Sequence, residues 1–238
     1  MRRPMTLLAV AALPSLARAQ HDDPASAGVH ESMGGGMPAT SMAAHLKMTP
    51  RRAPSPGDSA RAARTAAALR GALEKYRDVR AAARDGFTMF LPNVKDQRVY
   101  HFTSNRRALA AAFRFDPAEP TSLLYTKDAA GRFVLLGAMY TAPRHASLEE
   151  LDARVPLSVA RWHAHVDICV PRRGESERWR ETEGGRMRFG PAGAIATRAA
   201  CDAAGGRFFP QLFSWMVHAS VFAGDGRSDD PSTVWGQH

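Results

Sequence analysis

The sequence predicts a single α+β domain with a largely antiparallel sheet, flanked by a long N-terminal helix and by short helices. An apolar stripe at helical spacing, strand-like segments with alternating character, and a hairpin loop between two of them support this fold class. The chain has 238 residues, of which 45% are hydrophobic and 23% are charged. This composition excludes collagen-like, coiled-coil and wholly disordered chains.

The globular part is expected to begin near Asp58 or Ser59, either of which can cap a helix. Gly86 is expected to end this helix, because glycine readily adopts the left-handed backbone conformation found after the last helical turn. The apolar residues recur at spacings of three and four, which predicts a core-facing stripe. They are Ala62, Ala66, Leu69, Leu73 and Tyr76.

The rest of the chain alternates between strand and helix signals. Strands are expected at 97–103, 121–126, 132–141, 157–170 and 213–222. Short helices are expected at 105–113, from the Ser147 capping box to before Pro156, and at 195–204, with loop over 172–193.

The first 19 residues have the pattern of a secretory signal peptide. Met1-Arg2-Arg3 is a positive start, Met5 to Leu16 is mostly apolar, and Ala17-Arg18-Ala19 fits a cleavage site before Gln20. The apolar run is about 12 residues long, whereas a membrane-spanning helix needs about 20. We therefore expect an exported protein, periplasmic or extracellular, with no transmembrane segment in the mature chain.

Charge gives no indication of nucleic-acid binding. The formal net charge is +9, and arginines are spread along the chain. A nucleic-acid-binding protein is expected to carry a basic stripe with interleaved aromatic residues. The sequence has no such stripe, so the basic residues are interpreted as a solvated surface.

Residues 20–57 are expected to form a disordered tail or linker, because they are rich in Gly, Pro, Ser and Ala and lack aromatic residues. Thioethers and imidazoles suit copper, so this tail is a candidate accessory copper binder. A linker in which these side chains are incidental is the alternative. The candidate ligands are His21, His30, Met33, Met37, Met42, His45 and Met48.

The segment from Arg161 to Val170 carries the main candidate site. In a strand, His163, His165, Asp167 and Cys169 share one face, and the apolar residues between them share the other. Residues two apart lie about 6.6 Å apart, so His163 and His165 can hold one Zn or Cu ion. Asp167 is a candidate ligand, or a residue that orients His165.

A third ligand must come from another strand. His218 lies in the strand-like segment Trp215–Phe222, and antiparallel pairing would bring it beside the H-x-H pair. His101 is the next candidate. The alternative is that each histidine is a half-buried polar residue, hydrogen-bonded within an aromatic-rich core.

The chain has only two cysteines, Cys169 and Cys201. In an exported protein two cysteines most often pair. A disulfide closing a loop of about 32 residues would contribute about 3 to 4 kcal/mol to stability. Free thiols or metal ligands are the alternatives.

Several segments together resemble a group of uncharacterised secreted bacterial proteins. The resemblance covers most of residues 75–235 and implies an exported single domain, with no activity attached. It rests on Tyr76–Val79, Asp85–Phe87, Leu123–Gly131, Trp162–Val166 and Trp215–His218.

These patterns predict an exported protein that binds one Zn or Cu ion through His163, His165 and His218. The first alternative is a hydrolase in which the same ion activates water and Asp167 acts as base or orienting residue. The second is a metal-free binding domain stabilised by the disulfide.

Overall fold

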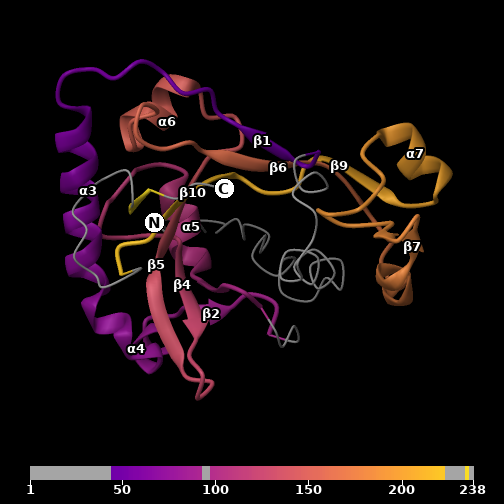
Figure 1. Cartoon of the computed structure of the whole chain (residues 1–238), viewed down its shortest axis with the longest axis horizontal. Helices are drawn as coiled ribbons and strands as arrows, with labels where there is room; N and C mark the ends of the chain where they lie inside the picture. Colours follow the sequence, from indigo (N-terminus) through magenta and orange to yellow (C-terminus); the bar gives the residue numbers. More distant parts are fainter. Residues whose placement is uncertain (1–43, 93–96, 223–233, 236–238) are drawn as a thin grey trace, which may run out of the picture.

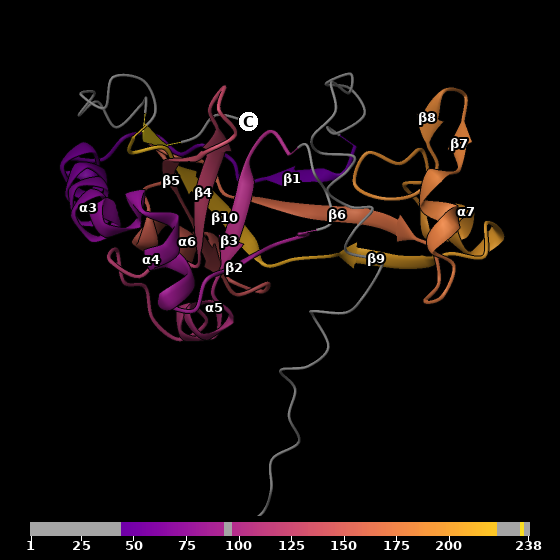
Figure 2. The ribbon, with the colours of Figure 1, turned by 90° about the horizontal axis from the view of Figure 1, so that it is seen from below.

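The computed structural model describes residues 44–92, 97–222 and 234–235. A strongly twisted antiparallel sheet forms the centre of the molecule, with helices α3 (Asp58–Leu73), α4 (Val79–Arg84) and α6 (Leu148–Arg154) on one side of it (Figures 1 and 2). Strand β6 (His163–Val170) extends out of this main body and, together with β9 (Arg207–Gln211), leads into a small lobe, residues 167–212 (Figure 2). This confirms the α+β class and the largely antiparallel sheet.

The main sheet has the order β1-β6-β10-β5-β4-β3-β2, and β9 pairs separately with β6. All of these pairs are antiparallel. The strands are β1 (Leu46–Met48), β2 (Thr88–Met89), β3 (Tyr100–Thr103), β4 (Ser122–Lys127), β5 (Phe133–Ala142), β6 (His163–Val170), β9 (Arg207–Gln211) and β10 (Trp215–Ala219).

The expected long helix up to Gly86 is wrong as a single element. It consists of α3 (Asp58–Leu73), the 3-10 helix η2 (Glu74–Arg77) and α4 (Val79–Arg84). Asp78 interrupts the helix because its backbone is extended and its side chain accepts a hydrogen bond from the Arg80 N–H, so it begins a new helix.

The apolar stripe of this segment is nevertheless buried, as predicted. Ala62, Leu69, Leu73 and Tyr76 are at most 1% exposed and pack in the main core between helices and sheet. Gly86 adopts the predicted left-handed conformation, with φ of 81°. The cap of α3 differs from expectation, because Gly57 takes the N-cap position with no side-chain hydrogen bond.

Two shorter helices lie where they were expected. Ser104 caps α5 (Asn105–Ala111) through its side chain. Ser147 and Glu150 form a complete capping box at the start of α6 (Leu148–Arg154). The predicted hairpin between β4 and β5 is also present.

The boundary expected at residue 58 differs from the structure. Residues 44–57 belong to the fold, because β1 pairs with β6 and Thr49 donates its N–H to the Trp162 carbonyl at 2.8 Å. A three-residue strand is too short to give a periodic pattern in the sequence, so β1 can be recognised only from its pairing with β6. The predicted signal peptide, residues 1–19, lies outside the described residues.

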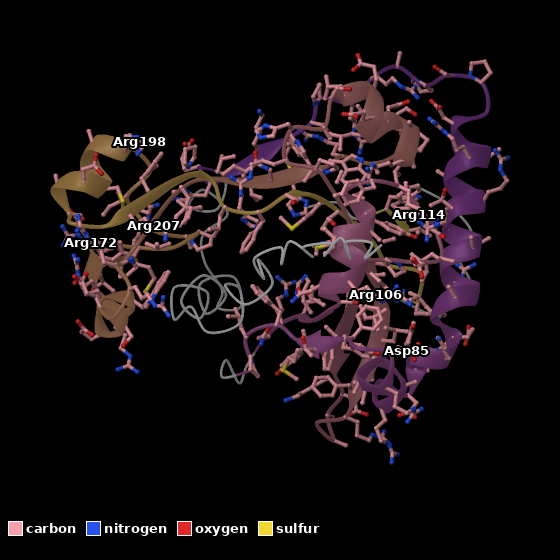
Figure 3. All side chains as sticks on the ribbon, turned by 180° about the vertical axis from the view of Figure 1, so that it is seen from behind. Asp85, Arg106, Arg114, Arg172, Arg198 and Arg207 are labelled. Carbon is pink, nitrogen blue, oxygen red and sulfur yellow. A yellow bond between two sulfur atoms is a disulfide. The ribbon has the colours of Figure 1, made fainter. Side chains whose placement is uncertain are left out.

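The small lobe has a core of its own, with Ile168, Trp179 and Phe189 among its buried residues. It contains η3 (Ser176–Arg180), β7 (Thr182–Glu183), β8 (Arg186–Met187) and α7 (Arg198–Ala203). The segment 172–193, which was expected to be a loop, therefore contains a 3-10 helix and two short strands. Strand β9 was not expected from the sequence. Arginine side chains project from this lobe (Figure 3).

The predicted disulfide is present. Cys169 at the end of β6 is bonded to Cys201 in α7, with Cα atoms 5.6 Å apart. Gly206 allows this close packing, because a Cβ there would lie 2.5 Å from the Cys169 sulfur. The disulfide thus joins the helix and the strands of the small lobe.

Candidate metal centre

Strand β6 turns its two histidines away from the main core. Trp162 and Ala164 are fully buried in that core, and alternation puts His163 and His165 on the opposite face of the sheet. Both histidines are nonetheless buried, at 3% and 5% exposed. The predicted division of this strand into a core face and a histidine face is correct here.

Strand β10 supplies the third predicted histidine. It pairs with β6 so that Met216 lies directly opposite His163. His218 follows two residues later on the same face of β10. The ring centroids of His163 and His218 are 5.2 Å apart, and those of His163 and His165 are 5.7 Å apart.

His101 extends this row of imidazoles. Its ring centroid lies 5.7 Å from that of His218, although β5 and β4 separate the two strands in the sheet order. Three strand intervals in a flat sheet span about 14 Å. The sheet therefore curves toward its histidine face, and the irregular register between Leu124 and Tyr125 provides a site for bending.

The ring separations match those of imidazoles around a common ion. Two imidazoles that share one tetrahedral ion, each with a ligating nitrogen about 2.1 Å away, have centroids about 5 Å apart. Within residues 44–92, 97–222 and 234–235, however, no three or more His, Cys, Asp or Glu side chains are already grouped to hold an ion. Binding through three histidines would thus require rotation of their rings.

Methionines flank the histidines in the strand registers. The sequence interpretation named Met48 only as a tail ligand and missed Met216 and Met139. Met48 on β1 and Met216 on β10 lie directly opposite His163 from its two sides. Met139 on β5 lies opposite His218. Such directly opposed residues have Cβ atoms about 4.5 to 5.5 Å apart, within reach of a thioether.

Apolar side chains adjoin this face. Met216, Met139 and Leu124 form a small buried cluster, against which Phe213 packs. The Phe213 ring also contacts His165, with centroids 5.9 Å apart. The histidine face is therefore partly apolar, and His163 and His165 are shielded from water, whereas His101 and His218 are half-buried. Alternation within Trp215–Ala219 is the signal that could have placed Met216 beside His218.

Asp167 does not join the histidines. Its φ of 56° is left-handed, a strained backbone conformation for a residue inside a strand. Among the described residues, its carboxylate has no hydrogen bond or ion pair. The structure thus gives Asp167 no contact through which to orient His165.

The tail residues separate into two groups. His21, His30, Met33, Met37 and Met42 lie outside the described residues. His45 lies inside them and is 1% exposed, with Nδ1 3.2 Å from the Val166 carbonyl oxygen and Nε2 2.9 Å from that of Gly193. Its ring bridges two backbone segments, whereas Met48 reaches the histidine face.

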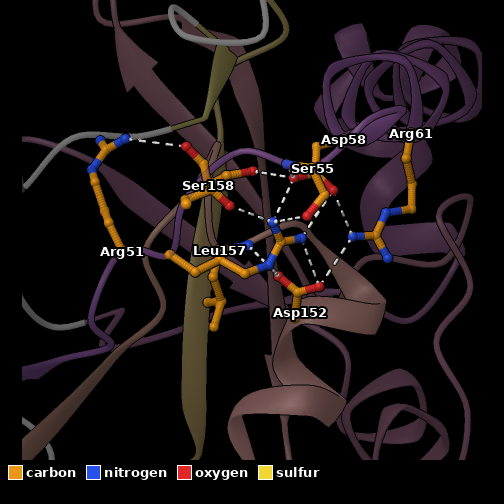
Figure 4. Close-up of polar contacts among 9 residues, drawn as sticks. Arg51, Ser55, Asp58, Arg61, Asp152, Leu157 and Ser158 are labelled. Atoms are coloured by element: carbon orange, nitrogen blue, oxygen red, sulfur yellow. Dashed lines mark hydrogen bonds and ion pairs between the residues drawn. The ribbon is translucent and has the colours of Figure 1, made fainter.

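A second polar cluster connects the N-terminal segment to the helices. Arg52 donates hydrogen bonds to both oxygens of Asp58, at 2.6 and 2.9 Å, and to both of Asp152, at 2.7 and 2.9 Å (Figure 4). Ser158 donates to Asp58, and Arg61 approaches both carboxylates. Because every carboxylate here is paired, the cluster is a structural connection.

The same contacts shift the acidity of both carboxyl groups. The hydrogen bonds from Arg52 hold the pKa of Asp58 well below its usual range, with help from Ser158 and the Ser55 N–H. Burial raises the pKa of Asp152, but hydrogen bonds from Arg52, Arg61 and the Leu157 N–H outweigh it, so the net shift is downward. Both groups are therefore ionised over the physiological pH range.

Comparison with known proteins assigns the chain to no family. No protein-family model, no curated protein and no solved structure was found to match the chain. Within the described residues, no helix has the length and apolar character needed to cross a membrane.

Proposed function

We propose that the protein binds one transition metal ion, copper or zinc, on the histidine face, through His163, His165 and His218. The observation that carries this proposal is the row of contacting imidazoles, at 5.2 and 5.7 Å, from two strands that are far apart in sequence. His101 is a further donor beside His218. Neutral imidazole is a favoured ligand of both metals.

Methionine favours copper over zinc. Soft thioether ligands select Cu(I), whereas Zn sites in proteins use thiolate, imidazole and carboxylate ligands. The registers place Met48 and Met216 on either side of His163. A ligand set of imidazoles and thioethers together also fits the observation that the histidines alone are not grouped around a single ion position.

Export is part of this proposal. The Cys169–Cys201 bond is typical of oxidising compartments, and the predicted signal peptide would direct the chain to one. The tail ligands from His21 to Met42 would act there as accessory copper binders.

Metal content of the purified exported protein, measured by mass spectrometry, tests the proposal. About one Cu or Zn ion per chain is expected, and a His163→Ala/His165→Ala variant should lose it. The matched control is His145→Ala, because His145 is exposed in a loop. No metal in the wild-type protein would overturn the proposal and favour the metal-free, disulfide-stabilised domain.

Methionine variants distinguish the two metals. Met48→Leu/Met216→Leu should weaken Cu(I) binding and leave Zn(II) binding unchanged, with Met187→Leu in β8 as the control. Unchanged Cu(I) affinity in the double variant would show that these two thioethers are not ligands. If the tail binds the copper instead, the His163→Ala/His165→Ala variant would keep its copper, and a Met33→Leu/Met37→Leu/Met42→Leu variant would lose it.

A further inference from the structure

The small lobe carries a hollow lined by arginines, separate from the histidine face. Its volume is about 390 Å³, within the range of small-molecule pockets. The lining residues are Arg172, Arg173, Arg198, Asp202, Gly206, Arg207 and Phe208. They come from the segment after β6, from α7 and from β9, and Figure 3 shows Arg172, Arg198 and Arg207 on this lobe.

The four arginines that line this hollow form no direct ion pair with a carboxylate among the described residues. Arg172 acts on Glu175 only weakly, because the pKa of Glu175 is lowered mainly by its hydrogen bond from Arg178 and to a smaller extent by the charge of Arg172. Other arginines of the same lobe do pair. Arg178 contacts Glu175 and Glu181 at 2.9 and 2.7 Å, and Arg188 contacts Glu181. The one carboxylate in the lining, Asp202, forms no hydrogen bond or ion pair within the part of the chain that the structure describes. The lining thus carries four positive charges and one negative charge.

Three of the guanidiniums are held in place by uncharged neighbours. Arg198 lies over the Phe208 ring at 4.9 Å, and Arg207 lies over the Phe209 ring at 4.6 Å. Arg172 donates from Nε to the Gly205 carbonyl at 3.1 Å. Stacking on a ring face orients a guanidinium and leaves its N–H groups at the edge available to a ligand.

One lining residue of the hollow, Gly206, packs against the disulfide. The space where its Cβ would lie is taken by the sulfurs of Cys169 and Cys201, at 2.5 and 2.9 Å. The backbone that carries Arg207 is therefore held against a covalent crosslink. Such a fixed frame reduces the entropy that is lost when a ligand is bound.

We propose that this hollow binds a small polyanion that carries phosphate or carboxylate groups. Guanidinium forks match both groups in bidentate geometry, and Phe208 adds an apolar surface for an organic part of the ligand. The volume exceeds what a single inorganic ion needs. The proposal does not depend on metal binding.

Calorimetric titration of the full chain with pyrophosphate and with citrate, at constant ionic strength in chloride, tests it. Saturable binding of one equivalent is expected. Preference for pyrophosphate would assign the ligand to phosphate compounds, and preference for citrate to polycarboxylates. Absence of saturable binding of both would overturn the proposal.

Charge variants of opposite sign make the test specific. Arg198→Gln and Arg207→Gln should each weaken binding roughly tenfold or more, as expected for loss of a charge-assisted hydrogen bond. Asp202→Asn should strengthen it about two- to fivefold, because a like charge is removed. Arg64→Gln on the exposed side of α3 is the control; equal weakening there would indicate a general charge effect and refute a built site.

Discussion

The rings of His163 and His218 are in contact, with centroids 5.2 Å apart and an interplanar angle of 78°. The two residues lie on neighbouring antiparallel strands, β6 and β10. This contact joins the H-x-H pair of β6 to the imidazole of His101 through His218. It is the contact on which a metal site at this face depends.

Replacement of His218 by alanine should weaken metal binding without unfolding the protein. Loss of a ligand should lower affinity more than the roughly 10- to 100-fold typical of outer-shell partners. Competition with a chelator would measure the affinity, and His145→Ala is the control. Equal affinities of the His218→Ala variant and the wild-type protein would exclude His218 as a ligand.

His45 should matter for stability and leave metal content unchanged. His45→Ala removes the ring between the carbonyls of Val166 and Gly193, which leaves buried acceptors at a cost of about 1 to 3 kcal/mol. Urea unfolding measures this loss. If the variant instead keeps its stability and loses copper, His45 is a ligand, as the tail hypothesis had it.

Gly137 on β5 should not tolerate a side chain. A Cβ there would lie 1.9 Å from the Ala219 carbonyl oxygen, so Gly137→Ala should destabilise the fold by about 1 to 3 kcal/mol or more. Gly71 in α3 has open space around it, and Gly71→Ala should stabilise by about 0.5 to 1 kcal/mol. The two substitutions are chemically identical, so opposite signs in thermal unfolding would confirm the close approach of the strands.

The disulfide should contribute strongly to stability. Cys169→Ser/Cys201→Ser opens a crosslink with a sequence separation of 32, which should cost about 3 to 4 kcal/mol. Denaturant unfolding with and without reductant measures it: the wild-type protein should respond to reductant, and the variant should not. An equal response of both proteins would contradict the prediction.

Acid should weaken the cluster around Arg52. Because the folded-state pKa values of Asp58 and Asp152 are lowered, their contribution to stability is present above the ordinary aspartate pKa of about 3.9 and is lost as the pH falls below it. Arg52→Leu should destabilise the protein at pH 7 and reduce its sensitivity to acid. Melting temperatures between pH 7 and pH 3 test this, with Arg64→Leu as the control.

Sequence alone determined the properties that depend on neighbouring residues. The alternation in Trp162–His165 gave the correct core face, the helical stripe from Ala62 to Tyr76 is buried, and Ser147 caps its helix. With only two cysteines, the disulfide had one possible pairing. Each of these follows from local periodicity, from side-chain chemistry or from a count.

Tertiary structure decided the rest, because strand order and register are properties of distant segments. Pairing of β10 with β6 brings Met216 opposite His163, and pairing of β1 brings Met48 there, although β1 has no periodic signal of its own. Asp167 has a left-handed backbone that no local pattern indicated, and Asp78 divides the long helix. The arginine hollow likewise forms only when α7, β9 and the end of β6 meet around the disulfide, because no single segment holds enough of its lining to reveal it.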